Sequence, residues 1–95
     1  MAAYLIADVV VTDERGFEEY RQKVPAVVAA YGGRYHVRGG AVQRLEGDAQ
    51  LHRVVVIEFA DMAQLKAFFY SPEYRPLIAM RQKASRINVF GVEGL

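Results

Sequence analysis

The chain has 95 residues, and its 12 Lys and Arg against 11 Asp and Glu give a net charge of +1, which offers no broad positive field for nucleic acid or an anionic membrane. No cysteine is present, which excludes disulfides and thiolate chemistry and fits a reducing compartment. The N-terminal apolar run is interrupted by Asp8 and follows no basic segment, so we expect no signal peptide and no membrane span, and a single cytoplasmic domain over residues 1–95.

The first third of the chain predicts a strand followed by a helix. Residues 3–12 are rich in β-branched side chains, which favour a strand. Between residues 16 and 31 the apolar side chains recur at helical spacing, and Gly32-Gly33 ends the predicted helix. Pro25 lies inside this segment and lacks a backbone N–H, so we expect a kink or a local break there.

The middle of the chain predicts a hairpin. Residues 34–38 and 41–45 have strand character on either side of Gly39-Gly40, where a bulge is expected. Residues 46–48 have the composition of a turn, and residues 52–59 give the strongest strand pattern of the chain.

The last third predicts a helix in two pieces and a closing strand. Asp61 is expected to cap a helix over residues 62–69. Ser71-Pro72 is expected to restart it, with the serine as cap and the proline in the first turn. Residues 86–92 predict the final strand. The order is then βαββαβ, so we expect an α+β ferredoxin-like fold with an antiparallel sheet of order 4-1-3-2 and both helical regions on one face.

Side chains alternate across a strand, so odd and even positions face opposite sides of the predicted sheet. The odd positions are almost wholly apolar and suit the face under the helices. The even positions mix apolar and polar residues: Tyr4, Ile6, Asp8, Val10, Arg34, His36, Arg38, Val54, Val56, Glu58, Asn88, Phe90 and Val92. Because an apolar surface of this kind is normally covered, we expect a homodimer that buries this face.

Three polar residues of the even face form the candidate site, with His36 and Glu58 as candidate catalytic residues and Arg38 as a candidate ligand-binding residue. A hairpin that turned around Gly47 would place His36 opposite Glu58, and Arg38 opposite Val56 and diagonal to Glu58. In a functional interpretation Glu58 orients His36 as a general base, while Arg38 holds an anionic substrate or a developing enolate. In the alternative interpretation Glu58 is only the buried counter-ion of Arg38.

Three further residues are candidates for ligand binding. Asp8 lies in the middle of the first strand, where an ionised carboxylate needs a partner. The expected partners, from either subunit, are Arg34, His36 and Arg38. Tyr74 and Arg81 share a helix face and would either frame the mouth of a pocket or pack against the rim of the sheet.

Other chemistries find little support in the sequence. His36 and His52 are separated by the predicted hairpin without a dense ligand motif, so no metal site and no cofactor are expected. The glycine pairs lack the Lys-Ser/Thr ending of a phosphate loop. RNA binding is not expected either, because Phe59 of the third strand would face the helices.

Several stretches make the chain resemble the family of the domain of unknown function numbered 1330, within the dimeric α+β-barrel superfamily. These stretches are VTD at 11–13, YGGRY at 31–35, VRGG at 37–40, LEG at 45–47, VIEF at 56–59 and SPEY at 71–74. The resemblance implies a barrel-forming dimer and a cleft of small-molecule size, but the family has no agreed catalytic residues to transfer.

Together the patterns favour a small homodimeric protein that binds or converts a small organic molecule in a cleft of the dimeric barrel without a cofactor. The molecule is expected to be anionic or to carry a carbonyl group. The alternative is a non-catalytic module that senses a metabolite or interacts with a partner, and a purely structural role is a third. The sequence alone does not decide whether the protein is an enzyme.

Overall fold

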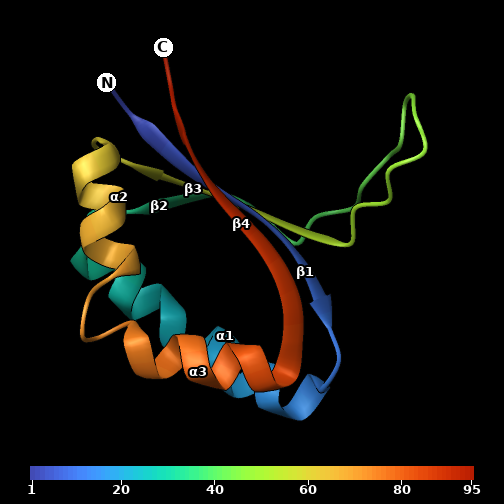
Figure 1. Cartoon of the computed structure of the whole chain (residues 1–95), viewed down its shortest axis with the longest axis horizontal. Coiled ribbons are helices and arrows are strands. Elements are labelled where there is room, and N and C mark those ends of the chain that lie inside the picture. The colour runs from blue at the N-terminus through green and yellow to red at the C-terminus, as the bar shows by residue number, and fades with distance from the viewer.

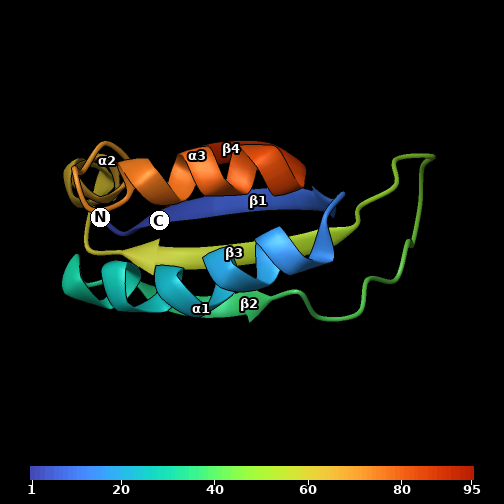
Figure 2. The same ribbon diagram turned by 90° about the horizontal axis from the view of Figure 1, so that it is seen from below.

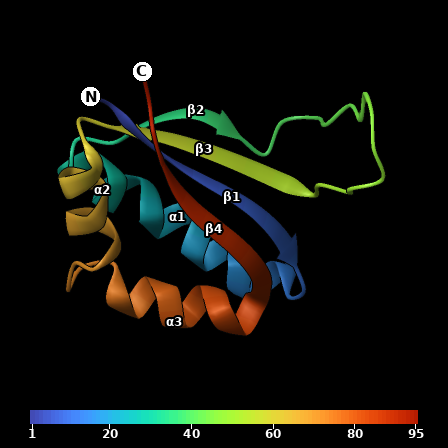
Figure 3. The same cartoon turned by 45° about the horizontal axis from the view of Figure 1, so that its top comes forward.

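The sheet is built around strand β1, Ala3–Val11, in a computed structural model that describes residues 1–95. The other strands are β2, Arg34–Arg38; β3, Arg53–Phe59; and β4, Ser85–Glu93. β1 pairs with β3 on one side and with β4 on the other, β2 pairs with the outer edge of β3, and every pairing is antiparallel (Figure 3). The order β2-β3-β1-β4 is the predicted order 4-1-3-2 read from the opposite edge, so the ferredoxin-like α+β fold is confirmed.

Three helices cover one face of the sheet (Figures 1 and 2). They are α1, Glu14–Ala30; α2, Met62–Phe69; and α3, Arg75–Ala84. Odd-numbered strand residues such as Leu5 and Ile57 are at most 5% exposed and form the core with the helices. Phe59 of β3 stacks on Phe68 of α2 with the ring centroids 5.3 Å apart. The predicted division of β1 and β3 into a helix-facing side and an open side is therefore confirmed.

The helix boundaries follow the capping signals only in part. Asp61 caps α2 as predicted, because its Oδ1 accepts a hydrogen bond from the backbone N of Gln64 at 2.8 Å. Ser71 instead closes a separate turn, in which its Oγ accepts a hydrogen bond from the backbone N of Tyr74 at 3.1 Å. The helix therefore restarts later than expected, and Pro76 rather than Pro72 occupies its first turn.

Of the kink or local break expected at Pro25, the break does not occur, because α1 runs as one helix through this residue. Proline removes one backbone hydrogen bond, but Val24 and Val28 on either side are at most 7% exposed and hold the helix on the sheet. None of the three helices is both long enough and apolar enough to cross a membrane.

Residues 39–52 form a long loop that projects away from the sheet (Figures 1 and 3). Gly39 turns the chain out of the ladder with φ of 75°. The predicted strand over residues 41–45 is wrong, because β3 begins only at Arg53 and leaves these residues no partner strand. Their backbone is solvated instead, and every residue from 40 to 52 is exposed.

Candidate functional site

A bulge in β2 decides which polar residues share a face. Arg34 pairs with Glu58 and Tyr35 with Ile57, but Val37 is the residue that pairs with Val56, so His36 is the extra residue of the ladder. The bulge was predicted at Gly39-Gly40, after the end of β2, but it lies at His36 inside the strand. Because one extra residue reverses the alternation that follows, every later side chain of β2 changes face.

Arg38 is consequently separated from the predicted cluster. It pairs with Val55 instead of Val56, and its guanidinium carbon lies 4.5 Å from the ring centroid of Tyr35 on the helix side. The expected convergence of His36, Arg38 and Glu58 is thus wrong for Arg38. Arg38 is therefore not available to bind a substrate beside His36 and Glu58. It is not available as the counter-ion of Glu58 either.

His36 and Glu58 do meet on the open face. Glu58 Oε1 accepts a hydrogen bond from His36 Nε2 at 2.6 Å and a second from the guanidinium of Arg34 at 3.2 Å. The hydrogen bond from His36 is the main cause that lowers the pKa of Glu58, and Arg34 adds to the effect. Since an ionised carboxylate only accepts, His36 carries its proton on Nε2. Arg34 therefore occupies the place predicted for Arg38.

Asp8 lies on the same face but belongs to a separate pair. Its Oδ1 accepts a hydrogen bond from the backbone N of His52 at 2.7 Å, and its Oδ2 lies 3.4 Å from Nδ1 of the same residue. Within the chain the partner of Asp8 is thus a histidine outside the predicted set. No three His, Asp or Glu side chains come together as ligands of a metal ion.

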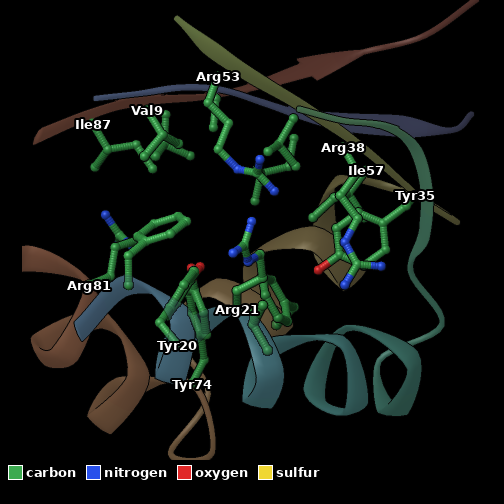
Figure 4. A pocket seen from close by; sticks show the side chains of 17 residues that line it. Val9, Tyr20, Arg21, Tyr35, Arg38, Arg53, Ile57, Tyr74, Arg81 and Ile87 are labelled. Atoms are coloured by element: carbon green, nitrogen blue, oxygen red, sulfur yellow. The ribbon is translucent and has the colours of Figure 1, made fainter. Parts of the chain in front are cut away.

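A cavity lies on the other side of the sheet, between the strands and the helices (Figure 4). It measures about 60 Å³ and is lined by 17 residues, of which 13 are hydrophobic. The other four are all arginines: Arg21, Arg38, Arg53 and Arg81. Neither a carboxylate nor an imidazole lines it, so the charged groups in the largely apolar wall are all positive.

Arg81 is the most deeply buried of these arginines. It is 3% exposed, its Nε has no hydrogen-bond partner, and it takes part in none of the five ion pairs of the structure. Its place in the last turn of α3 brings a favourable interaction with the helix dipole of about 0.3–1 kcal/mol. Burying an unpaired charge costs several kcal/mol, so the dipole alone does not account for Arg81.

Tyr74 lines the cavity together with Arg81, and both are buried there, whereas the mouth of a pocket or the rim of the sheet was predicted for them. Its hydroxyl lies 2.7 Å from the hydroxyl of Tyr20, which comes from α1 (Figure 4). Burial, reinforced by Tyr74, raises the pKa of Tyr20 well above its usual range. The Tyr20 hydroxyl therefore stays protonated at neutral pH and serves as a hydrogen-bonding group, not as a base.

Arg53 and Arg21 reach towards each other across the cavity, from the sheet and from α1 respectively (Figure 4). Arg21 forms an ion pair with Glu18 outside the cavity. Arg53 has no carboxylate partner; its guanidinium carbon lies 5.9 Å from the ring centroid of Phe17 and occupies the space that a side chain at Gly39 would need.

Sequence reasoning missed three cavity residues. Arg53 has the parity of Val55 and Ile57, so an arginine on the otherwise apolar odd side was a usable signal. Tyr20 and Arg21 lie at the edge of the apolar stripe of α1, where the sequence does not distinguish a cavity wall from solvent.

A four-stranded antiparallel sheet with helices on one face defines the α+β ferredoxin-like class, and the comparisons specify the family. Residues 2–95 match the model of the domain of unknown function DUF1330, and the chain belongs to this family. The resemblance noted in the sequence is thereby confirmed. No curated protein matches the chain.

Solved structures with the same fold are distant in sequence. RPA0582 from Rhodopseudomonas palustris, a protein of unknown function, is 18% identical with a TM-score of 0.79, over 99% of this chain and 82% of that one. A dimeric ferredoxin-like protein of unknown function from Jannaschia sp. CCS1 is 16% identical with a TM-score of 0.67, over 99% and 100%. SnoaB from Streptomyces nogalater, a cofactor-independent oxygenase, is 14% identical with a TM-score of 0.66, over 99% and 93%. At these identities the likeness shows the fold alone.

Proposed function

We propose that the protein is a homodimer that binds a small organic molecule in the cavity between sheet and helices of each protomer, without a cofactor. The observation that supports the proposal is the buried Arg81 in the cavity wall, which forms no ion pair and whose Nε has no hydrogen-bond partner in the protein. Polar groups are normally satisfied when they are buried, and a partner from outside the chain would satisfy this one.

The dimer is supported by the open face of the sheet and by the fold neighbours. Ile6, Phe90 and Val92 are between 36% and 63% exposed there, although they lie in or beside the central strand. The neighbour from Jannaschia is described as dimeric and ferredoxin-like. A second copy of the same sheet would cover this apolar surface together with the His36–Glu58 and Asp8–His52 pairs.

Binding is favoured over turnover in the cavity. Proton transfer at neutral pH needs a group such as a histidine or a carboxylate, and the cavity wall has neither. A protein that holds its ligand without converting it corresponds to the metabolite-sensing alternative.

Cofactor-free conversion of a small molecule on the open face of the sheet is the second candidate function. It is favoured by the close His36–Glu58 pair on the open face, where the imidazole has the orienting carboxylate that a general base needs. SnoaB, with the same fold, is described as a cofactor-independent oxygenase. Turnover of a ligand that disappears in His36→Ala but persists in Tyr74→Phe would establish this candidate.

The proposed function is tested by reducing the cavity volume. Ala7 is 4% exposed and lines the cavity from β1, so Ala7→Val narrows it with a strand-favouring side chain. Ala63→Val on the exposed side of α2 is the matched control. In a thermal-shift screen of short-chain neutral and charged organic compounds, a compound that stabilises wild type and Ala63→Val should stabilise Ala7→Val much less. A response equal in all three proteins, or absent from wild type, would contradict the proposal.

A further inference from the structure

We propose that the ligand of the cavity is an organic carboxylate, anchored by Arg81 at the buried end and admitted between Arg21 and Arg53. This inference rests on the proposed function and names its ligand class. A planar guanidinium binds a carboxylate through two parallel hydrogen bonds, which is the partner that the unsatisfied Arg81 lacks.

The first reason to expect a carboxylate is the charge of the cavity. All four of its charged side chains are positive, and only Arg21 is neutralised, by Glu18 on the surface. Like charges that point into one apolar space repel each other and are poorly solvated. An anion in that space would relieve both costs at once, whereas a cation would increase them and a neutral molecule would leave them unchanged.

The second reason is the pair of tyrosine hydroxyls in the cavity wall. Tyr20 and Tyr74 are hydrogen-bonded to each other, and both line the same cavity as Arg81. A protonated hydroxyl can turn its hydrogen towards an anion, so these tyrosines can add hydrogen bonds to a carboxylate that Arg81 holds. Apolar side chains such as Val9 and Ile87 form the opposite wall and suit a short aliphatic group (Figure 4).

The third reason is the route by which a ligand would enter the cavity. A groove on the surface adjoins the cavity and shares four lining residues with it, which are Val9, Phe17, Arg21 and Arg53. The side chain of Arg21 is 40% exposed, so this end of the cavity reaches solvent while Arg81 lies at 3%. An anion would therefore pass two guanidinium groups before it reached the third.

The proposal predicts a preference that calorimetry can measure. Acetate and propionate, which are small enough for a cavity of about 60 Å³, should bind wild-type protein about tenfold or more tightly than acetamide and propionamide, which have the same shape without the charge. Arg81→Met keeps an apolar side chain of similar length and should abolish that preference. Arg75→Met removes the same charge from an exposed site on α3 outside the cavity and should retain it.

Stability without ligand separates a binding role from a structural one. Arg81 forms no ion pair and its Nε has no hydrogen-bond partner, so Arg81→Met should melt at or above the temperature of wild type when no ligand is present. A large fall in the melting temperature of Arg81→Met would assign Arg81 a structural role and overturn the proposal.

The outcomes also separate this inference from the proposed function. If acids and amides bind wild type equally and Ala7→Val weakens both, the cavity is a binding site but the carboxylate class is wrong. A preference for the acids that persists in Arg81→Met would overturn the anchor. If none of the four compounds binds, both proposals fail. Equally tight binding of inorganic phosphate would show that the site takes a small inorganic anion and would overturn the organic class.

Discussion

Glu58 accepts hydrogen bonds from two basic side chains, and both favour its ionised form. His36 is the larger cause of its lowered pKa and Arg34 the smaller. A carboxyl whose pKa is lower in the folded state than in the unfolded chain stabilises the fold above its unfolded pKa, which is near 4.5. That contribution is lost as the pH falls through the folded pKa.

The acid limb of stability tests this coupling. We expect wild type to lose stability between about pH 5 and about pH 3 more steeply than Glu58→Gln, which cannot titrate. Urea denaturation across this range measures the difference. Glu93→Gln, at an exposed position outside the ion pairs, should follow wild type. Parallel curves for wild type and Glu58→Gln would show that His36 and Arg34 do not stabilise the carboxylate.

The Tyr20–Tyr74 hydrogen bond gives a second test at this scale. Tyr74 is 5% exposed, so Tyr74→Phe leaves the Tyr20 hydroxyl without its partner in a largely buried place. We expect the free energy of unfolding to fall by about 1–2 kcal/mol. Tyr70→Phe, at a residue that is 64% exposed, is the control and should change little. An unchanged urea midpoint for Tyr74→Phe would mean that water replaces the lost hydroxyl.

Beyond the bulge at His36, the alternation of side chains along β2 no longer predicts the face on which a residue lies. Parity correctly assigned the residues of β1 and β3 to their faces, but the bulge at His36 moved Arg38 to the opposite side of the sheet. The sequence near His36 has no glycine that would mark the bulge, whereas Gly39-Gly40 does attract that prediction. Arg38 therefore lines the cavity with Tyr74 and Arg81, the other predicted ligand-binding residues of the helix side.

At the scale of elements, the periodic segments were predictable and their connections were not. The four strands and the helical regions follow from apolar spacing that each element buries on the core. The segment 41–45 has a strand-like composition, but a strand also needs a neighbour, and β3 starts too late to provide one. The turn at Ser71 likewise depends on a local hydrogen bond that competes with the helix.

The connection from α1 to β2 provides the prediction at this scale. A Cβ at Gly33 would lie 2.7 Å from Val28 Cγ1 and 2.8 Å from Phe59 Cε1, and both neighbours are 1% exposed. Neither can move without disturbing the core, so Gly33→Ala should lower the free energy of unfolding by about 1–3 kcal/mol.

The control for this substitution is Gly40→Ala. A Cβ at Gly40 would meet nothing within 4 Å, and its φ lies outside the left-handed region. We expect its stability to equal that of wild type or to exceed it slightly, because alanine restricts the unfolded chain. Equal urea midpoints for Gly33→Ala and wild type would show that helix α1 can shift away from β3 at little cost.

At the scale of the whole molecule, the two faces of the sheet differ in how far the protomer itself covers them. The helix side is closed by the protein itself except for the cavity, while the open side exposes Phe90 at 63% and Val92 at 46%. Fully burying a side chain such as phenylalanine contributes about 1.5–3 kcal/mol. In a two-fold interface each residue counts twice, so a few such side chains are enough to hold a dimer together.

Phe90→Asp is the substitution that tests the dimer. Phe90 pairs with Ile6 across β1 and β4, so an aspartate there would place a charge in the middle of the covered face. Because both copies change, the loss is about 3–6 kcal/mol, or roughly a hundredfold to ten-thousandfold in the dissociation constant. Ala79→Asp adds the same charge to the exposed side of α3 and is the control. Light scattering at micromolar concentration should give a dimer for wild type and Ala79→Asp and a monomer for Phe90→Asp. A monomeric wild type would remove the dimer from the proposed function, and a dimeric Phe90→Asp would show that the protomers meet through another surface than the open face.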